Sequence, residues 1–277
     1  TASLHFKVAS MIKTGVMLMS NRGPDGQPWD WREALKRWKG LGLAGVDVFH
    51  GMLKANNETP TSIKRILDDL GLEPTVYCVP TNLVSPDPAD RATSLDTIRA
   101  GIDACGVLGV KHLFSHGGQH NNEGEDAFLR YMDGLNAAAE LVREAGLLFS
   151  IENAGKMCNS GASLARTLDL VKQPNMRITF DGGNFITCGD EPHDAIMTLR
   201  AKVAHVHVKS HVPAPPGSPR PYLYCPTGVG HPDYRFIRDR LIEVGYSGWM
   251  SFEPEGGFDS KWDQSIKTLA EIIAEIK

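Results

Sequence analysis

The sequence lacks the long apolar run that a membrane-spanning helix needs. Nowhere do about 18 consecutive apolar residues follow one another, and His5, Lys7 and Lys13 interrupt any signal-peptide core near the start of the chain. An excess of positive charge is also absent, because the formal net charge of the 277 residues is −4. Proteins that neutralise nucleic-acid phosphates normally carry a basic face. We therefore expect neither a membrane nor a nucleic acid as a partner.

Paired cysteines are missing as well. The five cysteines are odd in number and widely spaced, with no CxxC pair: Cys78, Cys105, Cys158, Cys188 and Cys225. This spacing argues against a disulfide framework and against a cysteine zinc site, and it fits a reducing compartment. We expect a cytoplasmic protein.

Apolar residues are present in the proportion that a large core requires. The chain is 42% hydrophobic and 22% charged, close to the globular average. Its 277 residues fit one large α/β domain better than two small ones, because barrels of roughly 250 residues are common. We expect residues 1–277 to form a single domain.

Short β-rich runs alternate with longer amphipathic stretches along the whole chain. The expected strands are Phe6–Met11, Gly45–Phe49, Glu73–Val79, His112–Ser115, Leu147–Glu152, Met176–Asp181, Val203–Val208 and Gly248–Glu253. The expected helices are Trp31–Leu41, Pro60–Leu70, Ala89–Leu108, Glu125–Ala145, Leu164–Val171, Ala195–Leu199, Tyr234–Val244 and Trp262–Ile276. Glycines that can adopt the left-handed conformation of a helix cap stand before several strands: Gly42, Gly71, Gly109, Gly146 and Gly245.

Eight strand–helix units with buried apolar strands predict a parallel sheet. A closed (β/α)8 TIM barrel of the α/β class is favoured over an open doubly wound sheet. The open sheet would use a glycine-rich phosphate loop after its first strand, and Met11–Arg22 contains no GxGxxG. Two Gly/Pro-rich loops, Gly23–Trp29 and Val212–Gly230, follow strands and would lie on the face where barrel active sites form. The longer loop is predicted to be a substrate lid, with a plain insertion as the alternative.

Potential metal ligands stand at the ends of four successive strands: Glu152, Asp181, His207 and Glu253. In a closed barrel these strand ends are neighbours, so the side chains can converge on one point. Three carboxylates and an imidazole suit Mn²⁺, Mg²⁺, Co²⁺ or Zn²⁺, whereas soft metals would need thiolate. A single acidic residue at a strand end is usually a helix N-cap or a surface ion pair. Three acidic residues and a histidine at four consecutive strand ends favour one divalent metal ion.

The seventh strand carries two histidines that point the same way by alternation. His207 is favoured as the ligand because it shares the face of Lys209 and lies closer to the loop end. His205 lies about 6–7 Å deeper, so it is predicted to be a hydrogen-bonded core residue.

The strand-end motifs resemble those of the xylose isomerase-like barrel superfamily, and within it the sugar (phosphate) isomerase/epimerase branch. That branch includes ketose 3-epimerases, hydroxypyruvate isomerases, inosose isomerases and dehydratases, and dehydroshikimate dehydratases. The resemblance covers nearly the whole chain; its motifs are specific for the superfamily and weak for the substrate. They are Ile151-Glu152-Asn153, Phe180-Asp181-Gly182-Gly183-Asn184, His205-Val206-His207-Val208-Lys209, Ser251-Phe252-Glu253, and Gly228, Gly230, Leu241, Gly245, Tyr246 and Gly248 before the last strand.

The resemblance implies that Glu152, Asp181, His207 and Glu253 hold one divalent ion, with Mn²⁺ favoured, and that the chain forms a homo-oligomer. It also implies that Glu152 and Glu253 are the catalytic acid/base pair. The predicted reaction is isomerisation or epimerisation of a small sugar or polyhydroxy keto compound. The metal acidifies a C–H beside the carbonyl and stabilises the enediolate, while the two carboxylates remove and return a proton.

A metal-dependent dehydratase of the inosose or dehydroshikimate type is the alternative, because the same enediolate could expel a hydroxyl as water. Ketose 3-epimerases usually carry a histidine three residues after the strand-six aspartate. Here that position is Asn184, which forms hydrogen bonds but does not titrate near neutrality. This departure keeps dehydration open.

Four residues are expected to contact the substrate: His116, Lys156, Asn184 and Lys209. His50 and Tyr77 are weaker candidates, and Trp29 and Trp31 either wall the pocket or anchor the first helix.

Two other functions remain as alternatives. Apurinic endonucleases share the superfamily, but they cluster several zinc ions and follow a basic groove, which this acidic chain does not predict. The other alternative is a non-catalytic relative that binds carbohydrate or metal.

Overall fold

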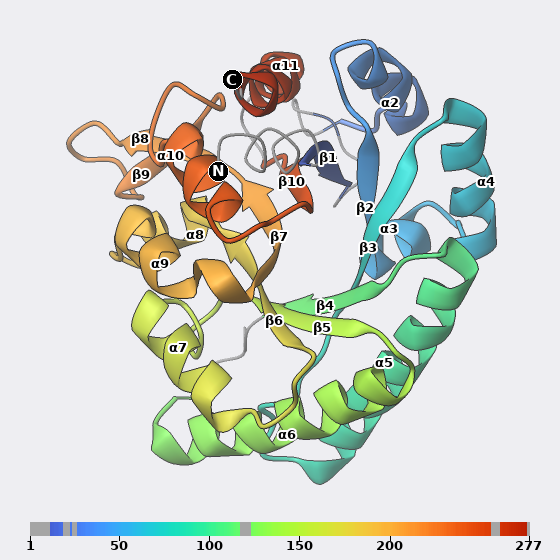
Figure 1. Ribbon diagram of the computed structural model, residues 1–277, viewed down its shortest axis with the longest axis vertical. Helices are drawn as coiled ribbons and strands as arrows, with labels where there is room; N and C mark the ends of the chain where they lie inside the picture. The colour runs from blue at the N-terminus through green and yellow to red at the C-terminus, as the bar shows by residue number, and fades with distance from the viewer. Residues whose placement is uncertain (1–11, 19–22, 24–26, 117–122, 256–260, 276–277) are drawn as a thin grey trace.

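Eight parallel strands close into a barrel at the centre of the protein (Figure 1). The computed structural model describes residues 12–18, 23, 27–116, 123–255 and 261–275. The strands follow the order β1-β10-β7-β6-β5-β4-β3-β2 around the barrel, so the predicted (β/α)8 barrel is confirmed and the open sheet is wrong. Their bounds are β1 Lys13–Leu18, β2 Gly45–Phe49, β3 Glu73–Val79, β4 His112–His116, β5 Leu148–Glu152, β6 Met176–Asp181, β7 Val203–Val208 and β10 Trp249–Phe252.

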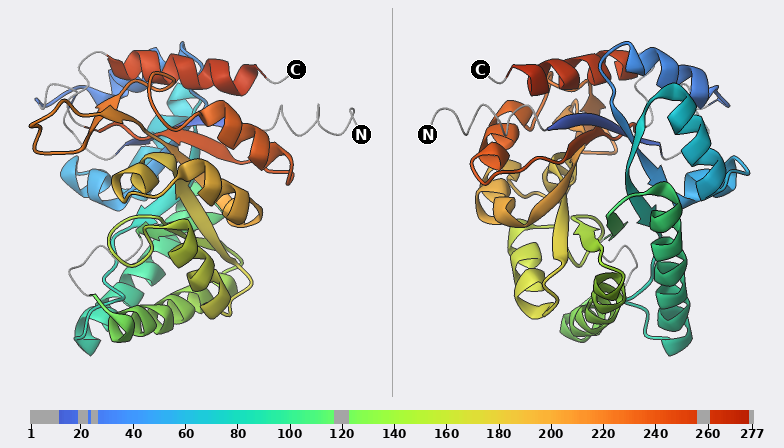
Figure 2. Two further views of the ribbon diagram at one scale, coloured as in Figure 1. Left: turned by 90° about the vertical axis from the view of Figure 1, so that its left-hand side faces the viewer. Right: turned by 45° about the vertical axis from the view of Figure 1, so that its right-hand side comes forward.

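Helices form the outer layer of the barrel, as Figures 1 and 2 show. They are α2 Trp31–Lys39, α3 His50–Ala55, α4 Pro60–Leu70, α5 Pro88–Leu108, α6 Glu125–Glu144, α7 Gly161–Leu170, α8 Gly182–Thr187, α9 Pro192–Leu199, the 3-10 turn Arg200–Lys202, α10 Tyr234–Ile242 and α11 Lys261–Ala274. Among the described residues, none of these helices is both long enough and apolar enough to cross a membrane.

Helix α2, near the start of the chain, packs against α11 near its end (Figure 2). The Trp29 ring lies 5.6 Å from Trp38 and 5.3 Å from Trp262, measured between ring centroids. Arg37 Nε donates to Asp263 Oδ2 at 2.7 Å across the same interface. Of the two roles predicted for Trp29, the structure therefore supports anchoring of the first helix.

The structure differs from the sequence prediction at the first strand and in two short helices. The first barrel strand is β1, further along the chain than the predicted Phe6–Met11, which lies outside the described residues. Lys13 is exposed at the start of β1 and pairs with Glu73, while Thr14–Leu18 is buried. A charged residue at the first position of a strand therefore does not prevent burial of the other strand residues. The short helices α3 and α8, directly after β2 and β6, were not predicted.

The proline-rich segment predicted as a lid contains a two-stranded antiparallel hairpin. Strand β8 (Ser210–Pro213) pairs with β9 (Tyr222–Cys225), and Ser210 lies opposite Cys225. In Figure 1 the hairpin stands beside the barrel, next to α10 and α8. The other predicted loop, Gly23–Trp29, is described only in part.

Helix ends follow the local signals that the sequence carries. The Thr59 hydroxyl of α4 accepts from the Ser62 amide in a capping box, with Pro60 in the first turn. Helix α5 begins after the N-cap Asp87 and ends at Gly109, which has a left-handed backbone. All five predicted capping glycines have positive φ: Gly42, Gly71, Gly109, Gly146 and Gly245. These caps lead the chain directly into the strands that carry the site.

Candidate active site

The four predicted ligand side chains converge at the carboxyl ends of neighbouring strands. Glu152 ends β5, Asp181 ends β6, His207 lies in β7, and Glu253 directly follows β10. One ligand atom from each lies within 4.8 Å of the others, and all four residues are buried. The Glu253 amide donates to the Val208 carbonyl at 3.1 Å, which keeps Glu253 beside β7. We call these four residues the carboxylate–histidine cluster.

His207 is in contact with both glutamates. Its Nδ1 lies 2.5 Å from Glu152 Oε1 and 3.2 Å from Glu253 Oε2. The second oxygen of Glu152 lies 2.8 Å from Nδ1 of His116, at the end of β4. The predicted substrate contact His116 is therefore part of the site, with its side chain 14% exposed.

Lys209 places an ammonium group among the remaining carboxylates. Its Nζ lies 3.0 Å from Asp181 Oδ2, 3.0 Å from Glu253 Oε1 and 3.2 Å from Glu255 Oε1. The ammonium is buried, so it offsets the charge of the buried carboxylates of Asp181 and Glu253, whereas the side chain of Glu255 is partly exposed. Lys209 was a predicted substrate contact; Glu255 had no predicted role.

Burial and neighbouring charge shift the pKa of every group in the cluster. Burial raises the pKa of Glu253, but Lys209 and His207 outweigh it and lower the pKa to about 2. For Glu152 the two imidazoles likewise outweigh burial and hold the pKa well below its usual value. Burial raises the pKa of Asp181 well above its usual value, and the glutamates raise it further against the effect of Lys209. The neighbouring positive charges thus favour the ionised form of both glutamates, whereas burial and the two glutamates disfavour the ionised form of Asp181.

Two buried oxygens of the cluster have the character of cation ligands. Asp181 Oδ2 and Glu253 Oε2 accept no hydrogen bond from the described residues, although the cations of Lys209 and His207 lie within 3.2 Å. Asp181 uses its other oxygen, Oδ1, as the N-cap of α8, accepting from the Asn184 amide at 2.9 Å. Buried carboxylate oxygens that lie beside an imidazole and accept no hydrogen bond from the described residues fit a divalent metal ion.

The other two predicted substrate contacts lie differently. Asn184 stands in the first turn of α8 and reaches the cluster through its backbone amide. The side chain of Lys156 is 54% exposed and forms an ion pair with Glu123. No contact of Lys156 with the cluster occurs among the described residues.

His205 is the buried, hydrogen-bonded core residue that the sequence predicted. Its Nε2 lies 2.8 Å from Oδ2 of Asp47, a buried carboxylate of β2 that also contacts His207. Sequence reasoning missed Asp47, yet a signal was present. An acidic residue between Val46 and Val48 in an apolar strand repeats the alternation of the two histidines in β7.

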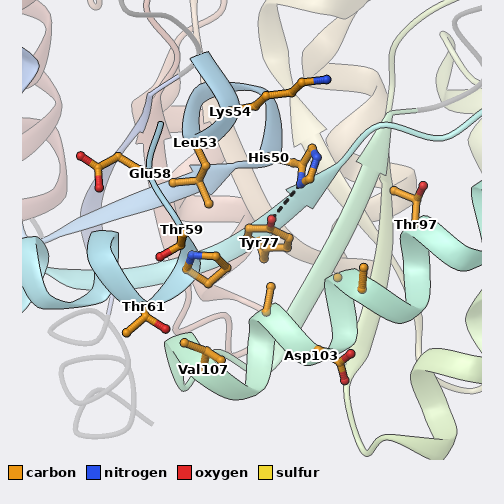
Figure 3. Close-up of a pocket in the computed structure, with 14 residues that line it drawn as sticks. His50, Leu53, Lys54, Glu58, Thr59, Thr61, Tyr77, Thr97, Asp103 and Val107 are labelled. Carbon is orange, nitrogen blue, oxygen red and sulfur yellow. Dashed lines mark hydrogen bonds between the residues drawn. The ribbon is translucent and has the colours of Figure 1, made fainter. Parts of the chain in front are cut away.

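The weaker candidates His50 and Tyr77 meet away from the cluster. They line a cavity of about 750 Å³ together with residues of α3, α4 and α5, and no member of the carboxylate–histidine cluster is among the described residues that line it. His50 Nδ1 lies 3.1 Å from the Tyr77 hydroxyl, and Figure 3 shows this pair beside Thr97 and Val107 of α5. Burial raises the pKa of Tyr77 to about 12.

Comparison with known protein families identifies the family to which the chain belongs. Residues 35–274 match the family described as the xylose isomerase-like TIM barrel, and the protein belongs to this family. An inosose dehydratase from Lacticaseibacillus casei is 22% identical over 144 residues, which are 47% of this chain and 48% of the dehydratase. The match therefore spans about half the length of this curated relative.

Three solved structures share the fold over nearly the whole chain. A protein assigned as a 3-DHS dehydratase of petrobactin synthesis in Bacillus anthracis has a TM-score of 0.76 and 15% identity, covering 95% of this chain and 99% of that one. The 3-keto-D-glucoside 4-epimerase of E. coli has a TM-score of 0.72 and 17% identity, with coverage of 95% and 99%. A Mycobacterium smegmatis barrel in complex with magnesium has a TM-score of 0.73 and 16% identity, with coverage of 96% and 97%. Proteins with this fold therefore include an epimerase and a protein assigned as a dehydratase.

Proposed function

We propose that the protein is a divalent-metal-dependent isomerase or epimerase of a small sugar or polyhydroxy keto compound. The observation that carries this proposal is that both glutamates contact the same ring nitrogen of His207. Nδ1 lies 2.5 Å from Glu152 Oε1 and 3.2 Å from Glu253 Oε2. Two carboxylates around one point can serve the two faces of a substrate carbon, which is what removal and return of a proton requires.

Glu152, Asp181, His207 and Glu253 would hold the metal ion. When bound there, a divalent ion would polarise a substrate carbonyl and its neighbouring hydroxyl, and so acidify the adjacent C–H. The donor set favours one Mn²⁺ ion, with Mg²⁺, Co²⁺ and Zn²⁺ as alternatives. The magnesium complex of the M. smegmatis barrel supports a hard cation.

The protein groups around the ion divide the proton transfer between them. Oε2 of Glu253 is buried and accepts no hydrogen bond from the described residues, so it would accept the substrate proton. Glu152, held by His116 and His207, would return a proton from the other side. Lys209 would donate to a substrate oxygen, and Asn184 and Lys156 remain proposed substrate contacts.

A dehydratase is the second candidate, and one contact favours it. His116 Nδ1 lies 2.8 Å from Glu152 Oε2, which provides a paired acid that could protonate a departing hydroxyl as water. The pKa of His116 lies well above its usual value because Cys78 and Glu152 outweigh the effect of burial. The similarity to an inosose dehydratase also supports this reaction.

Deuterium exchange and enone absorbance separate the two reactions. The Mn²⁺-loaded protein is incubated in D₂O with an inosose, 3-dehydroshikimate or a 3-ketoglucoside, and the products are followed by NMR and by ultraviolet absorbance. An isomerase or epimerase exchanges a substrate C–H for C–D and forms an isomer without enone absorbance. A dehydratase produces the conjugated enone.

The variant Glu253→Gln tests the assigned base in the same assay. We expect the rate to fall by about 10²–10⁴-fold because the amide cannot accept the proton. Glu140→Gln, at an exposed position of α6, is the matched control and should keep the wild-type rate. A wild-type protein that neither exchanges C–H nor forms an enone with these substrates would overturn the proposed function.

A further inference from the structure

Asp47 is a buried carboxylate that accepts four hydrogen bonds inside the barrel. The residue is 0% exposed, and its partners come from three strands. Oδ1 accepts from the hydroxyls of Thr75 on β3 and Ser251 on β10, the latter at 2.7 Å. Oδ2 lies 2.8 Å from Nε2 of His205 and 3.1 Å from Nε2 of His207. An ionised carboxylate only accepts hydrogen bonds, so every partner has to present a hydrogen to it.

This arrangement decides which nitrogen of His207 can bind a cation. Because Asp47 accepts from Nε2, the Nε2 position of His207 keeps its hydrogen. Nδ1 faces Glu152 at 2.5 Å and Glu253 at 3.2 Å, so it is the nitrogen that a metal ion among those carboxylates would meet. A bound ion would therefore replace the Nδ1 hydrogen and leave the Nε2 hydrogen on Asp47.

His205 supports the same assignment of hydrogens. Its Nδ1 is buried without a hydrogen-bond partner among the described residues, whereas its Nε2 contacts Asp47. A ring with its hydrogen on Nε2 rather than on Nδ1 satisfies this environment best, because an unpaired acceptor costs less than an unpaired buried N–H.

We propose that Asp47 is the positioning residue of the metal site: it keeps the hydrogen of His207 on Nε2 and aims Nδ1 at the ion. This inference rests on the proposed metal-dependent function. Histidine ligands commonly donate their other ring N–H to a carboxylate, which orients the ring and makes the ligand nitrogen more basic. Asp47 performs this task from β2, on the opposite side of His207 from Glu152 and Glu253.

The variant Asp47→Asn changes the hydrogen-bond pattern with little change of shape. If the asparagine oxygen still accepts the hydrogen bonds from the Thr75 and Ser251 hydroxyls, the NH₂ group of the asparagine faces His207 Nε2 and donates to it. The hydrogen of His207 then moves to Nδ1, where it opposes a cation. We expect the affinity for Mn²⁺ to fall by about 10- to 100-fold, the range seen when such partners of metal ligands are removed.

Ser251→Ala is the matched control. It removes one hydrogen bond from Asp47 Oδ1 and leaves the contact with His207 intact. The full metal-free chain of each variant is titrated with Mn²⁺ by calorimetry and by electron paramagnetic resonance, and circular dichroism verifies its fold. Ser251→Ala should lose stability but keep the wild-type metal affinity, whereas Asp47→Asn should lose affinity.

A second measurement needs no variant. In the wild-type protein labelled with ¹⁵N-histidine and loaded with diamagnetic Zn²⁺, we expect a slowly exchanging proton on Nε2 of His207. A proton on Nδ1 instead would overturn the inference, even if Asp47→Asn failed to fold.

The outcomes separate this inference from the proposed function. A wild-type chain that binds no divalent ion overturns the proposed function itself. Equal Mn²⁺ affinity of the wild type and Asp47→Asn overturns only the positioning role. Two ions per wild-type chain, one of them lost in Asp47→Asn, would also overturn it, because Asp47, His205 and His207 would then bind an ion directly.

Discussion

At the scale of single residues, buried polar side chains inside the barrel satisfy one another across strands. His112 Nε2 lies 2.7 Å from the Ser150 hydroxyl, which lies 2.7 Å from the Thr179 hydroxyl. These contacts join β4, β5 and β6 below the carboxylate–histidine cluster. Burial lowers the pKa of His112 to about 3, so the imidazole is neutral in the folded protein at ordinary pH.

The buried neutral His112 makes stability depend on acid. A histidine in the unfolded chain titrates near a pKa of about 6.5, so between about pH 6.5 and 3 the unfolded state binds a proton that the folded state does not. The free energy of unfolding therefore falls as the pH drops through this window, by up to about 1.4 kcal/mol per pH unit from this residue. The variant His112→Gln can keep the bond to Ser150 and should show a shallower slope.

Urea unfolding of both proteins at several values between about pH 6 and 4.5 measures this difference. The difference in slope isolates His112 from the other acidic and basic groups, which both proteins share. Equal slopes would mean that the folded protein protonates His112, contrary to its burial.

At the scale of secondary-structure elements, helix α5 contains one glycine that destabilises the helix and is followed by another that stabilises its end. Gly106 lies within the last turn of the helix, and no atom of the described residues lies within 4 Å of an added Cβ. Gly109 caps the helix with φ +73°. In the helix a glycine costs chain entropy, whereas at the cap it adopts a conformation that other residues avoid.

The two glycines of α5 should respond to alanine with opposite signs. We expect Gly106→Ala to raise the free energy of unfolding by about 0.5–1 kcal/mol, because alanine favours the helical conformation. We expect Gly109→Ala to lower it by about 1–2 kcal/mol, because its Cβ is strained at positive φ. Chemical denaturation of each variant measures both values, and each variant controls for the other. Changes of the same sign would contradict the assigned helix end.

At the scale of the whole molecule, the carboxylate–histidine cluster joins strands at the end of the barrel. Its three carboxylates come from β5, β6 and the residue after β10. Folding therefore brings three acidic groups together at one buried point. An ion that binds only the folded protein stabilises it in proportion to the logarithm of its concentration.

Metal binding should therefore stabilise the fold. At a free Mn²⁺ concentration of about 100 times its Kd, we expect about 2.7 kcal/mol and a rise in Tm of roughly 5–10 °C, measured by calorimetry. Excess chelator should reverse the rise. Asp181→Asn should abolish it, while the asparagine still caps α8. A Tm that does not respond to any divalent ion would contradict the proposed site.

The sequence by itself determined the barrel and the convergence of the four side chains predicted as metal ligands. The capping glycines and the alternation of strands and helices are local signals, and a parallel barrel places all strand carboxyl ends on one face. Glu152, Asp181, His207 and Glu253 were therefore predictable as neighbours. The roles given to them by the family resemblance remain predictions.

Only the tertiary structure decided how the other side chains meet this cluster. Asp47 finds partners from β3, β7 and β10 because barrel closure sets the strand registers, and no local pattern encodes those registers. Lys156 pairs with Glu123 and Lys209 reaches Asp181, although both lysines closely follow predicted ligand residues in the sequence. Spacing along the chain places a residue on a strand or in a loop, whereas packing between distant segments decides which groups its side chain contacts.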